Sequence, residues 1–168
     1  MSRLDSFLRR LIAQRDCLNL AAELIHGLPG PVFELGLGNG RTYDHLREIC
    51  PEREIFVFER RVSAHPDCIP DPEHLFEGLL EDRLSELQVR FAGRVALVHA
   101  DLGSGHPDQD ARTAAMISAG LPPFMCAGGV IVSDQELTLP AAETLPLPAA
   151  VQPGRYFLYR WPRVPAAA

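Results

Sequence analysis

The fold is decided by residues 32–42, which read VFELGLGNGRT. The first four residues are of apolar, extended character and suit a buried strand, and three glycines at alternate positions follow before a helical stretch begins. Glycine adopts backbone angles that a Cβ forbids and lets the chain pass close to a ligand. The N-terminus of the following helix presents unpaired N–H groups. A strand, a glycine turn and a helix in this order predict a nucleotide-type binding site in an α/β protein.

The spacing of the glycines separates two kinds of nucleotide site. A dinucleotide-binding turn reads G-x-G-x-x-G, whereas this stretch reads G-x-G-x-G, with Glu34 two residues before the first glycine. The acid-x-G-x-G-x-G form resembles motif I of the class I S-adenosylmethionine (SAM) methyltransferases. The resemblance implies SAM as the cofactor. It also implies a Rossmann-like α/β fold, with a mostly parallel central sheet, an antiparallel last strand and helices on both faces.

In that family the motif I acid lies near the methionine amino group, and the glycines face the methionine and ribose portions of SAM. We therefore expect Glu34 to contact the ligand's ammonium. The alternative is that Glu34 has no ligand contact and is only screened by Arg41, and the sequence would be the same in that case. The resemblance assigns cofactor contacts to the acid, the glycines and two polar neighbours, namely Glu34, Gly36, Gly38, Asn39, Gly40 and Thr42.

A second strand is predicted over residues 54–59, EIFVFE, because the run is β-branched and aromatic. It ends in Glu59, 19 residues after Gly40. In Rossmann-like folds an acid at this tip accepts hydrogen bonds from both ribose hydroxyls. A surface glutamate paired with Arg60 or Arg61 is the alternative, but the spacing from the turn favours the ribose contact.

Residues 72–91 have two interpretations. A short third strand over residues 74–78 completes the expected order of strands. The alternative is one helix over the whole stretch, because its leucines also recur at helical spacing, and Gly78 opposes that helix only mildly. We expect the short strand.

The loop after the third strand meets the adenine in this family, so the resemblance adds Gly78, Leu79 and Leu80 to the cofactor contacts. Many relatives carry an acid directly after the glycine. Here Leu79 stands at that position, and Glu81 or Asp82 is the nearest substitute.

Residues 94–101, RVALVHAD, are the most apolar run and predict a strand buried on both faces. His99 inside it is expected to be a satisfied core histidine. Asp101 ends the strand at the edge where open α/β sheets bind ligands, so we assign it to the cofactor and, with His106, to catalysis. His106 follows in a glycine-containing loop and titrates in the range of a general base, although an exposed loop histidine would look the same.

Residues 127–134, AGGVIVSD, resemble the Gly-Gly turn and fifth strand of the family, without its proline. Catechol-type methyltransferases place carboxylate and amide ligands for magnesium at the ends of such strands, and hard oxygen ligands suit that ion. By that resemblance Asp101, Asp134 and Gln135 are magnesium candidates. Acids at strand ends also occur as caps, so we expect no metal.

The remaining segments complete one domain over residues 1–168, whose cofactor-binding core is residues 32–134. Residues 1–27 predict a helix that either covers the sheet or closes over the ligand. Residues 155–161 predict the antiparallel terminal strand. Residues 137–152 are rich in proline and alanine and show no clear sixth strand.

Composition limits the partners. The net charge is −6, so the chain lacks the excess of basic residues that is typical of nucleic-acid binding. No apolar run approaches the roughly 20 residues of a membrane span. Four dispersed cysteines without a C-x-x-C pair indicate reduced thiols, and we expect a cytoplasmic protein that acts on a small molecule. The sequence leaves open whether the protein forms a homo-oligomer.

Together these features predict a SAM-dependent methyltransferase with a small-molecule acceptor. Methyl transfer from a sulfonium mainly requires alignment of donor and acceptor, so no fixed catalytic triad is needed. Two alternatives are an NAD(P)-dependent oxidoreductase, which the glycine spacing opposes, and a SAM-binding regulator without catalysis, which the absence of an evident proton acceptor keeps open.

Overall fold

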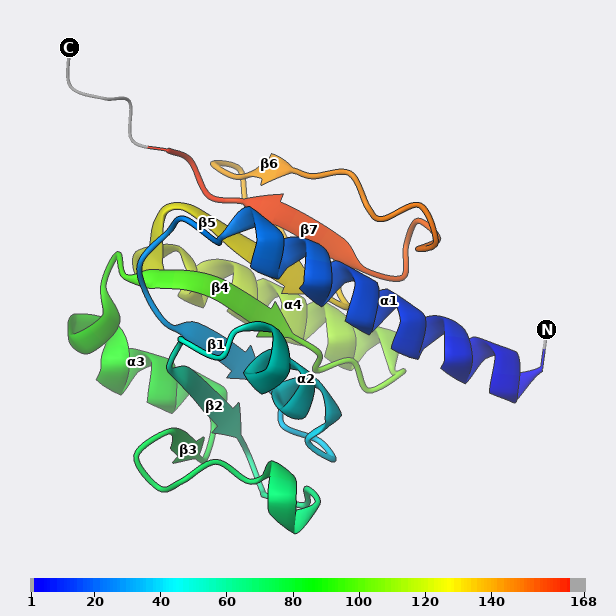
Figure 1. Cartoon of the computed structure of the whole chain (residues 1–168), viewed down its shortest axis with the longest axis horizontal. Coiled ribbons are helices and arrows are strands. Elements are labelled where there is room, and N and C mark those ends of the chain that lie inside the picture. Colours follow the sequence, from blue (N-terminus) through cyan, green and yellow to red (C-terminus); the bar gives the residue numbers. More distant parts are fainter. Residues whose placement is uncertain (1, 164–168) are drawn as a thin grey trace.

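Seven strands form one sheet in the order β3-β2-β1-β4-β5-β7-β6 in the computed structural model, which describes residues 2–163 (Figure 1). The first five strands along the chain pair in parallel, and β7 runs antiparallel to both β5 and β6. The strands are β1 (Val32–Leu35), β2 (Ile55–Glu59), β3 (Leu75–Glu77), β4 (Val95–Ala100), β5 (Met125–Ser133), β6 (Glu143–Thr144) and β7 (Phe157–Arg160). The expected mostly parallel sheet with a reversed last strand is confirmed.

Four α-helices cover the two faces of the sheet. They are α1 (Arg3–Leu24), α2 (Arg41–Ile49), α3 (Leu80–Phe91) and α4 (Pro107–Gly120). Helices α1 and α2 lie on one face, and α3 and α4 lie on the other (Figure 1). None of the helices within residues 2–163 is both long and apolar enough to span a bilayer.

The stretch that allowed two interpretations is a strand followed by a helix. The turn between them is Gly78, whose φ of +138° side chains rarely adopt. Its N–H donates to the carbonyl of Glu59 at 3.0 Å, which extends the pairing with β2 by one residue. The expected short third strand is therefore present as β3, and α3 begins directly after Leu79.

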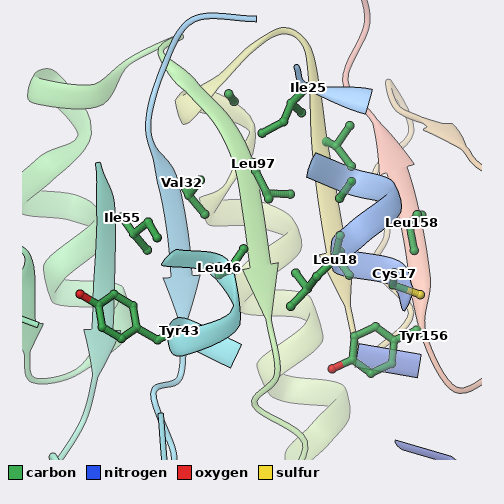
Figure 2. Packing of buried hydrophobic residues seen from close by; sticks show 14 of the residues in the cluster. Cys17, Leu18, Ile25, Val32, Tyr43, Leu46, Ile55, Leu97, Tyr156 and Leu158 are labelled. Carbon is green, nitrogen blue, oxygen red and sulfur yellow. The ribbon is translucent and has the colours of Figure 1, made fainter. Parts of the chain in front are cut away.

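Helix α1 has two differently packed halves. Its start is capped by Ser2 and Asp5, whose side chains satisfy each other's backbone N–H groups. The C-terminal half buries Cys17 and Leu18 against the sheet (Figure 2). The N-terminal half continues past the carboxyl ends of the strands (Figure 1), and its Leu4 and Leu8 are exposed. The helix thus covers one face of the sheet and also reaches over the edge where ligands bind.

Alternation along β1 separates two cores. Phe33 and Leu35 pack on the α3–α4 side, whereas Val32 packs on the α1–α2 side. The α1–α2 side is mostly aliphatic near the amino ends of the strands (Figure 2). Toward the carboxyl ends it becomes polar, because Glu34 of β1 lies beside His99 of β4 in register. This polar end of the face forms the floor of the site described next.

Candidate functional site

A cavity of about 260 Å³ opens at the carboxyl edge of the sheet. The glycine turn and the start of α2 form one wall, and α1 forms the opposite wall. Its lining consists of Phe7, Arg10, Leu11 and Gln14 from α1, residues 36–39 of the turn, Arg41 and Thr42 of α2, and Asp101 after β4. Four of the expected cofactor residues, Gly36, Gly38, Asn39 and Thr42, therefore lie here together with Asp101, and the residues of α1 join them.

The three glycines of the turn have different reasons to be glycine. A Cβ on Gly36 would stand 2.6 Å from Leu102, and a Cβ on Gly40 would overlap Cys68, so these two positions are fixed by the protein's own packing. Gly38 has a φ of +53° and nothing within 4 Å of the place where its Cβ would lie. Since Gly38 lines the cavity, its bare backbone leaves room that a ligand can use.

Glu59 at the end of β2 braces the turn. Its Oε2 accepts the N–H of Leu37 at 2.8 Å and that of Gly38 at 3.2 Å, and its Oε1 accepts the N–H of Arg61 at 3.0 Å. A carboxylate has about four lone-pair sites, so a further donor can still be accepted. The contact is to the backbone N–H of Arg61, and within residues 2–163 Glu59 forms no ion pair with Arg60 or Arg61.

Glu34 lies beneath the turn rather than in the cavity. Its carboxylate is fully buried, accepts a hydrogen bond from the Thr42 hydroxyl, and pairs with Nδ1 of His99 at 2.7 Å. Both oxygens therefore have partners within the protein, and Glu34 is not among the residues that line the cavity, so the expected contact with the ligand's ammonium stays a prediction. Burial lowers the pKa of His99, but the neighbouring Glu34 carboxylate outweighs it and leaves that pKa above its ordinary value.

Asp101 is the carboxylate that lines the cavity. Its side chain is 10% exposed and pairs with the Arg10 guanidinium at 2.5 Å. It also accepts a hydrogen bond from the Gln14 amide. Both partners come from α1, so this helix is tied directly to the end of β4.

Asp134 stands beside Asp101, because β4 and β5 pair with Ala100 opposite Ser133. Its oxygens accept the N–H of Leu102 at 3.3 Å and that of Gly103 at 3.0 Å, and the amide of Gln135 approaches at 3.3 Å. Burial, and then the nearby Asp101 carboxylate, raise the pKa of Asp134 to about 6. Within residues 2–163 no three His, Cys, Asp or Glu side chains are grouped to hold a metal ion.

The raised pKa of Asp134 predicts a pH-dependent stability. Its charged and titratable neighbours are Asp101, Arg10, Tyr156 and His99. The folded state holds the proton more tightly than the unfolded state, whose value is near 3.8, so this stabilisation is complete below that pH and is lost as the pH rises through about 6. Denaturant unfolding of the wild type and of Asp134→Asn between pH 4 and 7 measures this effect. As the pH rises, the free energy of unfolding of the wild type should fall by about 1–3 kcal/mol more than that of the variant. Parallel curves for the two proteins would contradict the assignment.

The other expected residues lie outside this cavity. His106 is exposed at the cap position of α4, and its N–H donates to the hydroxyl of Ser104 at 3.2 Å. Gly78, Leu79 and Leu80 form the turn from β3 into α3, and Leu79 is 50% exposed. These three positions stand beyond the end of β2, on the same carboxyl edge of the sheet.

The sheet order, the glycine turn after β1, the acid ending β2 and the reversed β7 together define a Rossmann-like methyltransferase. A family model described as S-adenosyl-L-methionine methyltransferase matches residues 1–161. A crystal structure of an S-adenosyl-L-methionine methyl transferase from Silicibacter pomeroyi DSS-3 is 45% identical, with a TM-score of 0.91, over 95% of this chain and 98% of that chain. The chain belongs to this S-adenosyl-L-methionine methyltransferase family, and SAM is its cofactor.

More distant structures share the fold alone. A fibrillarin/Nop5p complex is 16% identical, with a TM-score of 0.54, over 91% of this chain and 83% of that chain. MycE methyltransferase from the mycinamycin biosynthetic pathway, in complex with Mg and SAH, is 15% identical, with a TM-score of 0.52, over 89% of this chain and 48% of that chain. A search of curated proteins gave no match.

Proposed function

We propose that this methyltransferase acts on a small-molecule acceptor. The observation that carries the proposal is the position of α1, which forms one wall of the cavity and is held there from two sides. Arg10 ties α1 to Asp101, and Arg155 donates to the hydroxyl of Ser6 at 2.9 Å. A site walled in this way suits a small acceptor better than a broad macromolecular surface. The net charge of −6 also gives no footprint for nucleic acid.

The residues of the cavity fit the cofactor, which supplies an activated methyl group on a sulfonium. The chain's task is then to bind, to orient and to take up a proton where the acceptor carries one. We assign a ribose hydroxyl to the remaining acceptor site of Glu59, the backbone approach to Gly38 and the ammonium to Asp101. Asn39 and Thr42 border the same space.

The N-terminus of α2, which follows Gly40, presents N–H groups suited to the ligand's carboxylate. The turn of Gly78, Leu79 and Leu80 is our assignment for the adenine, where the exposed Leu79 offers an apolar surface. Asp101 and His106 stay the predicted proton acceptors on the acceptor side. Of these two, Asp101 lines the cavity and His106 does not.

The test is a screen of metabolite extracts for methylated products by mass spectrometry, with labelled SAM and the purified protein. We expect a small molecule to gain the labelled methyl group. Labelling found only in added RNA or protein would overturn the small-molecule assignment while leaving the methyltransferase activity intact. Calorimetry of SAM binding in parallel shows whether a negative screen reflects a missing acceptor or a missing cofactor.

Substitution of Glu59 tests the ribose contact. We expect Glu59→Ala to weaken SAM binding by about 1–3 kcal/mol, or about 5- to 150-fold, since hydrogen bonds to a charged group and a brace of the turn are both lost. Glu54→Ala, directly before β2 at the opposite edge of the sheet, is the control and should bind SAM like the wild type. Equal affinities for the two variants would place the ribose elsewhere.

A further inference from the structure

A buried polar chain runs beneath the cavity and meets it at both ends. It begins at Thr42, whose hydroxyl donates to Glu34, and continues through the 2.7 Å pair between Glu34 and Nδ1 of His99. Nε2 of His99 lies 3.3 Å from the hydroxyl of Tyr156, and the two rings are nearly parallel. The residues of this buried polar chain come from β1, α2, β4 and the segment before β7.

The chain continues from Tyr156 back to the cavity. The Tyr156 side chain packs below Cys17 and Leu18 of α1, with its hydroxyl directed toward β4 (Figure 2). The Gln14 side chain of α1 lies close to this hydroxyl and donates to Asp101. Thr42 at one end and Gln14 with Asp101 at the other all line the cavity. His99 and Tyr156, in the middle, do not touch it.

Stability gives no reason for this arrangement. Glu34 and His99 are both 0% exposed, and the surrounding cluster is mostly aliphatic. Removing two charges from water costs several kcal/mol per ion, and well-packed apolar side chains in their place are often as stable or more so. A buried pair between the central strands therefore calls for a role other than holding the sheet together.

We propose that His99 and Tyr156 are positioning residues for the cofactor, acting on opposite walls of one cavity. His99 fixes the Glu34 carboxylate, which orients the Thr42 hydroxyl and the start of α2. Tyr156 fixes Gln14, which holds Asp101 and the adjoining turn of α1. This inference rests on the proposed location of SAM in the cavity, and it adds that the two walls are coupled through the sheet.

The test compares two buried tyrosines that each lose one hydroxyl. Tyr156→Phe interrupts the buried polar chain, whereas Tyr159→Phe removes a hydroxyl that accepts the N–H of Leu137 at 2.9 Å among the side chains of the α3–α4 face. Calorimetry should show that Tyr156→Phe weakens SAM binding about 5- to 20-fold and Tyr159→Phe changes it less than 2-fold, although both lower the melting temperature. Unchanged affinity in Tyr156→Phe despite lower stability would overturn the proposal.

A double-mutant cycle tests the coupling itself. Thr42→Val and Tyr156→Phe alter side chains that are joined through Glu34 and His99, so non-additive effects on the SAM dissociation constant, by at least 3-fold, are expected. Thr42→Val combined with Tyr159→Phe should be additive. Additivity in both cycles would overturn the coupling. The proposed location of SAM is tested separately. If the wild type binds SAM, and Thr42→Val and Glu59→Ala each bind it with the wild-type affinity, the proposed location is wrong.

Discussion

Gly38→Val is expected to weaken SAM binding at least 100-fold while the protein stays folded. The open space beside Gly38 lies in the cavity wall, and a valine side chain would fill the region where the backbone has to approach the ligand. The protein itself leaves room for the added Cβ, because nothing stands within 4 Å of it. Calorimetry with SAM and circular dichroism of the same sample separate loss of the ligand from loss of the fold.

Backbone strain needs its own control, since Gly38 has a φ of +53°. A β-branched residue there costs of order 1–3 kcal/mol irrespective of any ligand. Gly93 has a φ of +65°, also has nothing within 4 Å of its Cβ position, and lies in the turn before β4 at the opposite edge of the sheet. Gly93→Val should lose similar stability and keep its affinity for SAM. If both variants bind SAM normally, the ligand does not approach Gly38.

The backbone elements around this site could be predicted from the sequence, because each of them is encoded by a short continuous segment. The glycine turn, the acid that ends β2, and β4 with the Asp101 that follows it are each contained in fewer than a dozen consecutive residues. Parallel strands bring their carboxyl ends to one edge, so these features meet once the order of strands is known. Strand β6 was not identified because it has two exposed residues, Glu143 and Thr144, in a segment without alternation.

The pairing beneath the turn could not be predicted in the same way. Glu34 and His99 are 65 residues apart, and their contact depends on the register between β1 and β4. A buried histidine was expected, but not its partner. The sequence did offer one signal about the direction of the His99 side chain. His99 and Asp101 are two residues apart, so their side chains project to the same face of the sheet, toward the site. The motif I acid was assigned to the cofactor by resemblance to the family, and the structure adds two partners within the protein that the sequence did not indicate.

The sequence left open whether the helix over residues 1–27 covers the sheet or closes over the ligand. Arg10 and Gln14 reach the end of β4 from a helix whose pattern showed only that one side is apolar. The pattern is the same whether a helix lies on the sheet or overhangs its edge. The length of α1 relative to the strands decides this, and that length has meaning only after the strands are placed in space.

Asp101→Asn is the second substitution for which we expect a large loss of cofactor affinity. Asp101 supplies the negative charge in the lining of the cavity, and its present partner is the Arg10 guanidinium at 2.5 Å. Hydrogen bonds to charged groups contribute about 1.5–3 kcal/mol, which corresponds to a loss of about 10- to 150-fold. The change also leaves Arg10 without its carboxylate, so a cationic ligand would meet an uncompensated positive charge.

Comparing the binding of SAM and S-adenosylhomocysteine decides which positive charge of the ligand lies beside the Asp101 carboxylate. SAM carries an ammonium and a sulfonium, whereas S-adenosylhomocysteine carries the ammonium alone. If Asp101 holds the ammonium, calorimetry of Asp101→Asn should show the same loss for both ligands. A loss confined to SAM would place the carboxylate beside the sulfonium and make it a neighbour of the transferred methyl group. Asp108→Asn, which alters an exposed acid in the first turn of α4, should leave both affinities unchanged.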